Sequence, residues 1–218
     1  MTNDEDLLMT PWFERWLYGV MWLGLLLLAT LPLIPEGTPA TTVIANMLRM
    51  DFAEVNGITF AVFNLLGVLP AACAAILLYD TGRLPPQPFV IGSFFLGGFA
   101  LLPYLAWRRT DTPLRAEPDP ITRALGSAAA GLIYVVLAAV LVLLAILWGD
   151  PRAYLQQAMQ SKFIAVMSLD FLILTAVLHR LVSVDRARRI THETPLLRLM
   201  STVIPLFGPL LYLSRRRS

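Results

Sequence analysis

The sequence predicts an all-helical integral membrane protein. Of its 218 residues, 57% are apolar and only 15% are charged, whereas soluble domains are roughly 45–50% apolar and about 25% charged. The charges are also segregated. Among 17 basic and 15 acidic residues, only Asp170, Arg180 and Arg198 fall inside the six main apolar segments. A bilayer demands this segregation of charge. The segregation also excludes disordered, fibrous and nucleic-acid-wrapping classes of protein.

Six apolar segments have lengths near the roughly 20 residues that a helix needs to cross a bilayer. They are Trp16–Ile34, Gly57–Tyr79, Phe89–Trp107, Ala124–Trp148, Phe163–Val182 and Leu196–Leu213. Helices are favoured over strands because no segment shows the alternation of a barrel strand. The sixth segment is the shortest and is interrupted by Pro205, Gly208 and Pro209.

Two connections are expected to form short helices in the headgroup plane. In Thr41–Val55 and in Pro151–Gln160, apolar residues recur at helical spacing, with polar residues off that stripe. Asp150 precedes Pro151, a pair typical of an N-cap and a first helical position. The alternative is that each connection only extends the neighbouring span.

The chain also shows signs of internal duplication. When Tyr104 is aligned with Tyr212, a phenylalanine, two leucines, the tyrosine and two arginines coincide between residues 99–109 and 207–217. We therefore predict one membrane domain, 1–218, with possible three-helix halves 12–109 and 121–217 and a central polar loop, 110–120. Three spans in each half would make the halves inverted, as in many transporters. Chance similarity between apolar runs is the alternative.

The basic residues leave the number of crossings at five or six. If all six segments cross, seven basic residues lie on one side and ten on the other, which is a weak bias. If the sixth segment dips into one leaflet and returns, the numbers become four and thirteen. The positive-inside rule would then place the central loop and the C-terminus in the cytoplasm and the N-terminus outside. We expect six helices and leave the orientation open.

Asp170 is the main candidate for function, because it lies well inside the fifth segment. A carboxylate at that depth costs roughly 2.5–3.5 kcal/mol, so it must pair, face a wet cavity or hold a proton. One interpretation is a hydrogen bond to Asn64, which would join corresponding helices of the two halves. The other is a relay for protons or cations, or a contact to a transported solute.

Several arginines next to apolar segments are candidate contacts to lipid headgroups. They are Arg108, Arg109, Arg180, Arg186, Arg188 and Arg189. Their guanidinium groups can reach headgroup phosphates while their stems lie along the acyl boundary. The alternative is that they only end a span at the interface.

The sequence gives no positive sign of an enzyme, a cofactor or a metal. Cys73 is the only cysteine, and the two histidines are too far apart in sequence for a typical metal-binding motif. The net charge of +2 gives no general attraction for nucleic acid. The acidic N-terminus (Asp4, Glu5, Asp6) argues against a cleavable signal peptide.

Four motifs are similar to a known family. They are Phe63–Pro70, Ser93–Leu105, Met167–Phe171 and Pro205–Tyr212. They resemble an uncharacterised multi-pass membrane protein family of cyanobacteria and plastids, over most of the chain from Thr41 onward. The resemblance implies a thylakoid or plasma membrane location and a role near photosynthetic complexes. It carries over no catalytic residue, because no activity is established for that family.

Two functional hypotheses follow. In the first, the protein is a non-catalytic scaffold, assembly factor or accessory subunit of a larger membrane complex, and its partners are the lipid bilayer and other membrane proteins. In the second, it is a small ion or solute transporter built from inverted repeats that uses Asp170. The small residues suited to helix packing and the absence of catalytic motifs favour the first hypothesis. The duplication and Asp170 favour the second.

Overall fold

The computed structural model describes residues 12–49, 55–108, 112–189 and 204–216. Over these residues the chain forms helices and no strand, apart from an isolated β-bridge between Asp80 and Leu114. The helices are α1 (Trp12–Thr30), α2 (Ala40–Leu48), α3 (Gly57–Leu77), α4 (Gln87–Leu96), α5 (Gly98–Trp107), α6 (Pro120–Leu125), α7 (Ala128–Trp148), α8 (Pro151–Gln160), α9 (Lys162–Arg189) and α11 (Phe207–Arg215). The predicted all-helical class is confirmed.

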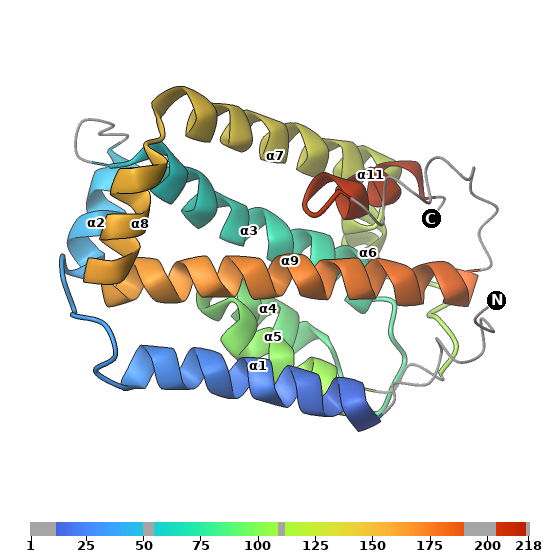
Figure 1. Ribbon diagram of the computed structural model, residues 1–218. Coiled ribbons are helices and arrows are strands. Elements are labelled where there is room, and N and C mark those ends of the chain that lie inside the picture. The colour runs from blue at the N-terminus through green and yellow to red at the C-terminus, as the bar shows by residue number, and fades with distance from the viewer. Residues whose placement is uncertain (1–11, 50–54, 109–111, 190–203, 217–218) are drawn as a thin grey trace.

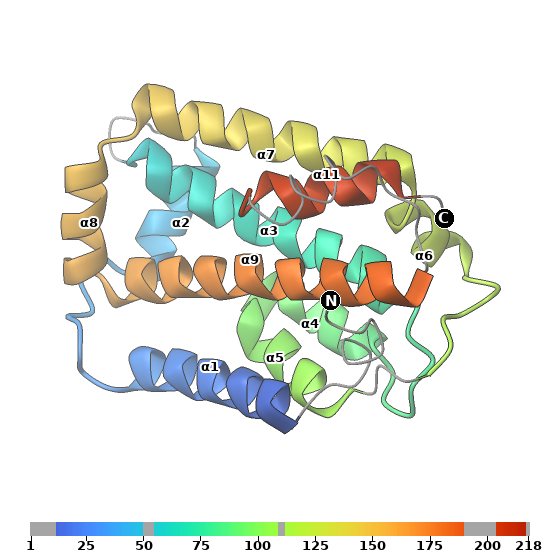
Figure 2. The same cartoon turned by 45° about the vertical axis from the view of Figure 1, so that its right-hand side comes forward.

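Four helices, α1, α3, α7 and α9, run along the length of the molecule (Figure 1 and Figure 2). The central helix α3 contacts α7, α9 and α4, whereas α1 packs on α5 and α9. The short helices α2 and α8 lie at one end of the molecule, which we call the α8 end. The opposite end holds the last turns of α3 and α9, and we call it the arginine-rich end because of the side chains described below.

Three described helices, α3, α7 and α9, are long and apolar enough to cross a membrane. They contain most or all of the predicted second, fourth and fifth spans, and they are compatible with an integral membrane location. Helix α1 overlaps the predicted first span, but it begins earlier and carries Glu14 and Arg15 in its first turn. The predicted count of six spans is not confirmed.

The two predicted short helices are present in the described residues. Helix α8 has the predicted bounds, and the Asp150 carboxylate accepts hydrogen bonds from the backbone N–H groups of Arg152 and Ala153 at its first turn. Helix α2 covers the first part of the predicted Thr41–Val55 helix, and residues 50–54 lie outside the described residues. Both helices are separate from the long helices that follow them.

The predicted third span, Phe89–Trp107, is wrong, because this segment folds back on itself. Helices α4 and α5 have ten residues each. Between them Gly97 has a φ of +54°, a backbone conformation that residues other than glycine rarely adopt. The rings of Phe89 and Tyr104 lie 5.3 Å apart between centroids, so the start of α4 lies next to the end of α5. The segment is a helical hairpin with both ends at the arginine-rich end.

The predicted sixth span, Leu196–Leu213, is described only from residue 204. Its described part is mainly α11, whose nine residues are too few to cross a bilayer. Arg189 at the end of α9 and Arg216 after α11 both form ion pairs with Asp185. The last turn of α9 and the end of α11 therefore lie at the same end of the molecule, and residues 190–203 between them lie outside the described residues.

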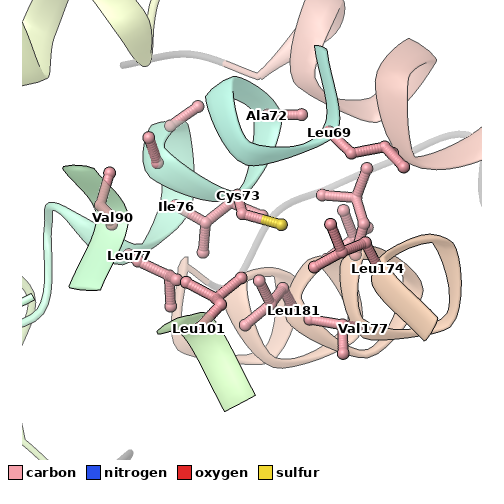
Figure 3. Close-up of a cluster of buried hydrophobic side chains, with 14 of the residues drawn as sticks. Leu69, Ala72, Cys73, Ile76, Leu77, Val90, Leu101, Leu174, Val177 and Leu181 are labelled. Carbon is pink, nitrogen blue, oxygen red and sulfur yellow. The ribbon is translucent and has the colours of Figure 1, made fainter. Parts of the chain in front are cut away.

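A buried apolar cluster joins α3, the hairpin and α9 (Figure 3). Ala72 and Cys73 of α3 have no exposed surface, and their small side chains let α9 approach closely. Leu174 and Leu181 of α9 fill the space opposite, and Leu101 of α5 reaches the same cluster. This packing fixes the hairpin against α3 and α9, where the candidate site lies.

Candidate functional site

A cavity of about 410 Å³ lies between α3, α9 and the tip of the α4–α5 hairpin. Nine of its fourteen lining residues have apolar side chains, and five of these are phenylalanines: Phe63, Phe94, Phe95, Phe99 and Phe163. The polar side chains in the lining are those of Asn64, Ser93 and Asp170. The structure thus places both predicted intramembrane polar residues in one cavity.

Asp170 holds the tip of the hairpin. Its Oδ1 accepts a hydrogen bond of 2.8 Å from the backbone N–H of Gly98, the first residue of α5. A helix N-terminus offers unpaired N–H groups and a partial positive charge, so it stabilises an ionised carboxylate. A Cβ atom built on Gly97 would lie 1.7 Å from Asp170 Oδ2, and one on Gly98 would lie 2.6 Å from Oδ1. The two glycines therefore allow the carboxylate to approach the backbone.

The polar groups of the cavity keep free acceptors. Asn64 Nδ2 donates to the carbonyl of Phe60 at 2.8 Å, and Ser93 Oγ donates to the carbonyl of Val90 at 2.7 Å. In the described part of the chain, no hydrogen bond reaches Asp170 Oδ2 or Asn64 Oδ1. The predicted hydrogen bond between Asn64 and Asp170 is therefore wrong, since each side chain bonds a backbone group instead.

At the arginine-rich end, Asp80 accepts bonds from three side chains. Its Oδ2 binds Tyr104 Oη at 3.0 Å and Arg108 Nη1 at 3.1 Å, both from the end of the hairpin. Its Oδ1 binds Arg188 Nη1 at 2.5 Å, and Arg188 Nη2 also donates to the carbonyl of Thr112. Asp80 is 2% exposed and Arg108 is 3% exposed, so this is a buried ion-pair cluster.

Asp185 has the same set of partners in the second half. Its Oδ2 binds Tyr212 Oη at 2.8 Å and Arg216 Nη1 at 3.1 Å, and its Oδ1 binds Arg189 Nε at 3.0 Å. Arg216 Nη2 further donates to the carbonyls of Ala75 and Gly126. Burial raises the pKa of Tyr212, as it does for the tyrosine in the first cluster, so both phenols stay protonated and donate.

The matching clusters, one around Asp80 and one around Asp185, relate the two halves of the chain. In each cluster, one carboxylate oxygen accepts hydrogen bonds from a tyrosine and an arginine spaced four residues apart. The other oxygen accepts a bond from an arginine of α9. Both carboxylates lie at the same end, because α3 and α9 run in the same direction (Figure 1). The predicted inverted arrangement of the halves is therefore wrong. The internal duplication itself stays a prediction.

Most arginines predicted to contact headgroups instead pair within the protein. Arg108, Arg188 and Arg189 bind the buried carboxylates, and Arg180 forms an ion pair with Glu14 of α1. The guanidinium of Arg186 lies 5.3 Å from the centroid of the Tyr212 ring, close enough for a cation–π contact. Arg109 lies outside the described residues. For the buried Arg108 and Arg188 the headgroup assignment is wrong, and for Arg180 and Arg189 it stays a prediction.

The sequence interpretation missed Asp80 and Asp185 as buried partners of these arginines. A signal was present in the aligned repeats, since the tyrosine and the arginine four residues after it reach a carboxylate in each repeat. An aspartate follows the second segment of each half closely, at a similar distance before the repeat. That spacing would have predicted two equivalent charged clusters.

The described residues contain no group of three or more histidine, cysteine or acidic side chains that could hold a metal ion. Comparisons with protein families, with curated proteins and with solved structures give no match for this chain. The resemblance to a cyanobacterial and plastid family therefore stays an expectation.

Proposed function

We propose that this protein crosses the membrane four times and binds a small molecule in the Asp170 cavity, as a carrier or permease of that molecule. The four crossings are α1, α3, α7 and α9. Helix α1 runs alongside α9 and is tied to it by the Glu14–Arg180 ion pair. Its 19 residues cover roughly 28 Å, close to the hydrocarbon thickness. The hairpin and α11 enter from the arginine-rich end without crossing.

The positions of the basic residues support this topology and give its orientation. Eleven described basic residues lie at the arginine-rich end: Arg15, Arg83, Arg108, Arg115, Arg123, Arg180, Arg186, Arg188, Arg189, Arg215 and Arg216. Three lie at the α8 end: Arg49, Arg152 and Lys162. By the positive-inside rule the arginine-rich end faces the cytoplasm, or the stroma in a thylakoid membrane. In this topology α1 also starts on that side, contrary to the orientation expected for five crossings.

The cavity is the main observation that supports this proposed function. Non-helical backbone inside a membrane is tolerated where it is buried or lines a cavity, and Gly97 at the hairpin break lines this one. Transporters bind their substrates near the midplane, at such broken helices. The free acceptors Asp170 Oδ2 and Asn64 Oδ1 select a molecule that donates hydrogen bonds.

A second candidate is a role as an accessory subunit in a larger complex. The outward face of α7 favours it, because only 22% of that helix's most apolar window is buried inside the protein. Lipid chains or a partner helix must cover the rest of that window. This candidate needs no cavity.

Analysis of small molecules that co-purify with the protein tests the first candidate. In Asp170→Asn, the amide oxygen can still accept from Gly98, but the nitrogen replaces the free acceptor with a donor. We expect this variant to fold and to lose the bound molecule detected by mass spectrometry. Thr175→Val is the matched control, because Thr175 lies on α9 outside the cavity and bonds only its own helix at Phe171. Equal retention in both variants would contradict the proposal, and wild-type protein without a small molecule that co-migrates with a large complex would favour the second candidate.

A further inference from the structure

The cavity has its exposed rim halfway along α3. Gly67 lines the cavity, is exposed, and lies at the centre of the 21-residue helix. A Cβ atom built on Gly67 would meet no atom within 4 Å. Opposite it, at the tip of α4, Phe95 is 84% exposed and Leu96 is 60% exposed. These residues surround an opening on the side of the protein, away from either end.

The depth of this opening places it among the acyl chains. Gly67 is about 15 Å along α3 from each end of the helix, at 1.5 Å per residue. A hydrocarbon layer of roughly 30 Å has its midplane at the same depth. In the proposed topology the opening therefore faces lipid, and the exposed Phe95 and Leu96 lie in an apolar solvent that suits them.

We propose that the molecule bound in the cavity is lipid-soluble, carries a hydroxyl or amino group, and enters sideways from the bilayer. This inference rests on the function proposed above and adds the class and the route of the ligand. The donor group reaches the free acceptors Asp170 Oδ2 and Asn64 Oδ1 at the inner wall. The apolar body lies between aromatic rings, including those of Phe63 and Phe99.

The competing route is an aqueous one from the α8 end. A second cavity there is lined by Glu36 and Lys162, and it shares Phe163 and Val166 with the wall of the first. A water-soluble ligand would have to pass between these charged groups and then displace the Phe163 ring. The charged groups on the aqueous route and the lateral rim of the first cavity favour entry from lipid.

Spin labels measure what the opening contacts, whether or not a ligand binds. In a Cys73→Ala background, which removes the only cysteine, a nitroxide is attached at Gly67→Cys in protein reconstituted into phospholipid bilayers. Gly24→Cys on the exposed face of α1 and Gln156→Cys on α8 provide the bilayer and aqueous references. We expect the label at position 67 to collide readily with oxygen and poorly with a water-soluble nickel chelate, as at position 24. Ready collision with the chelate, as at position 156, would overturn entry from the bilayer.

Binding of 2-naphthol tests the ligand class in the same bilayers. Its methyl ether has almost the same apolar body but no donor, so it should bind about 10- to 100-fold more weakly, the loss expected for a hydrogen bond to a charged group. Gly67→Phe should block 2-naphthol by filling the opening. The control Gly24→Phe, where the backbone also has open space, should not.

The two measurements separate the possible failures. If the ether binds as well as 2-naphthol, the donor requirement is wrong, whatever the spin labels report. If 2-naphthol binds through Asp170 but Gly67→Phe has no effect, the function stands and lateral entry is refuted. If neither compound binds while the label at position 67 contacts lipid, the opening is as described and the proposed ligand class is refuted.

Discussion

Loss of the negative charge at Asp185 is predicted to be strongly destabilising. The substitution Asp185→Asn keeps the shape of the side chain but leaves Arg216 and Arg189 without their counter-charge. The Asp185 and Arg216 side chains are both 0% exposed, so water cannot solvate the uncompensated guanidinium. The amide oxygen can still accept the bonds from Tyr212 and Arg216, but the amide nitrogen cannot accept the bond from Arg189.

The expected magnitude follows from burial. Removing one partner of a buried ion pair costs about 3–5 kcal/mol, mainly because a charge is left unpaired in a low-dielectric site. Glu36→Gln is the matched control, since it neutralises the partner of Lys162 in an ion pair whose Glu36 side chain is 84% exposed. Exposed pairs contribute roughly 0–1 kcal/mol.

Reversible unfolding in mixed micelles, by titration of a denaturing detergent, measures the free energy of unfolding of the Asp185→Asn and Glu36→Gln variants. Because Asp80 has an equivalent set of partners, Asp80→Asn should cost a similar amount. A combined variant, Asp185→Asn with Arg216→Gln, should cost less than the sum of the two single losses, since the charges are coupled. If Asp185→Asn destabilises the protein no more than Glu36→Gln does, the assignment of a buried ionic cluster is refuted.

Two further predictions concern local geometry. Gly97→Ala should destabilise the protein by about 1–3 kcal/mol or more. Its positive φ disfavours any side chain, and the new methyl group would overlap the Asp170 carboxylate. Gly24→Ala, measured by the same unfolding assay, should be close to neutral. The pKa of Asp119 lies below its ordinary 3.8 because the Thr122 hydroxyl and backbone N–H groups donate to the carboxylate. This stabilisation of α6 is present above pH 3.8 and is lost as the pH falls through the lowered pKa. Thr122→Val should raise that pKa in a carboxyl NMR titration, and an unchanged value would contradict the role of the hydroxyl.

The helices themselves could be predicted from the sequence, because the signals that define them are local. The span from Gly57 and the Asp150–Pro151 pair predicted the starts of α3 and α8. In the structure the Asn56 and Asp150 side chains accept bonds at the first turns of these helices. The hairpin could not be predicted in this way. Its 19 residues, 89–107, have the length of a span, and the Asp170 carboxylate that binds the break at Gly97–Gly98 is remote in sequence. A pair of glycines in an apolar run also suits close packing of an unbroken helix.

The arginines show the same division between local and tertiary information. Their position at the ends of apolar segments predicts a place near the membrane surface, but it does not identify their partners. An arginine such as Arg188 next to an apolar segment can equally reach a phosphate or a buried carboxylate. Which one it reaches depends on whether α3 brings Asp80 beside α9, and only packing decides that.

Asp170 and Asp80 bind the two ends of helix α5, which forms part of the cavity wall. Its first N–H is bound by Asp170, and Arg108 just after its last turn is bound by Asp80. The carbonyl of Phe99 near its start also accepts a bond of 3.0 Å from the Trp22 indole of α1. A half-length helix inside a bilayer has no lipid headgroup to anchor its inner end, so its position depends on such protein contacts. Because these contacts hold both ends of α5, they also fix Gly97 and Phe99 in the wall of the Asp170 cavity.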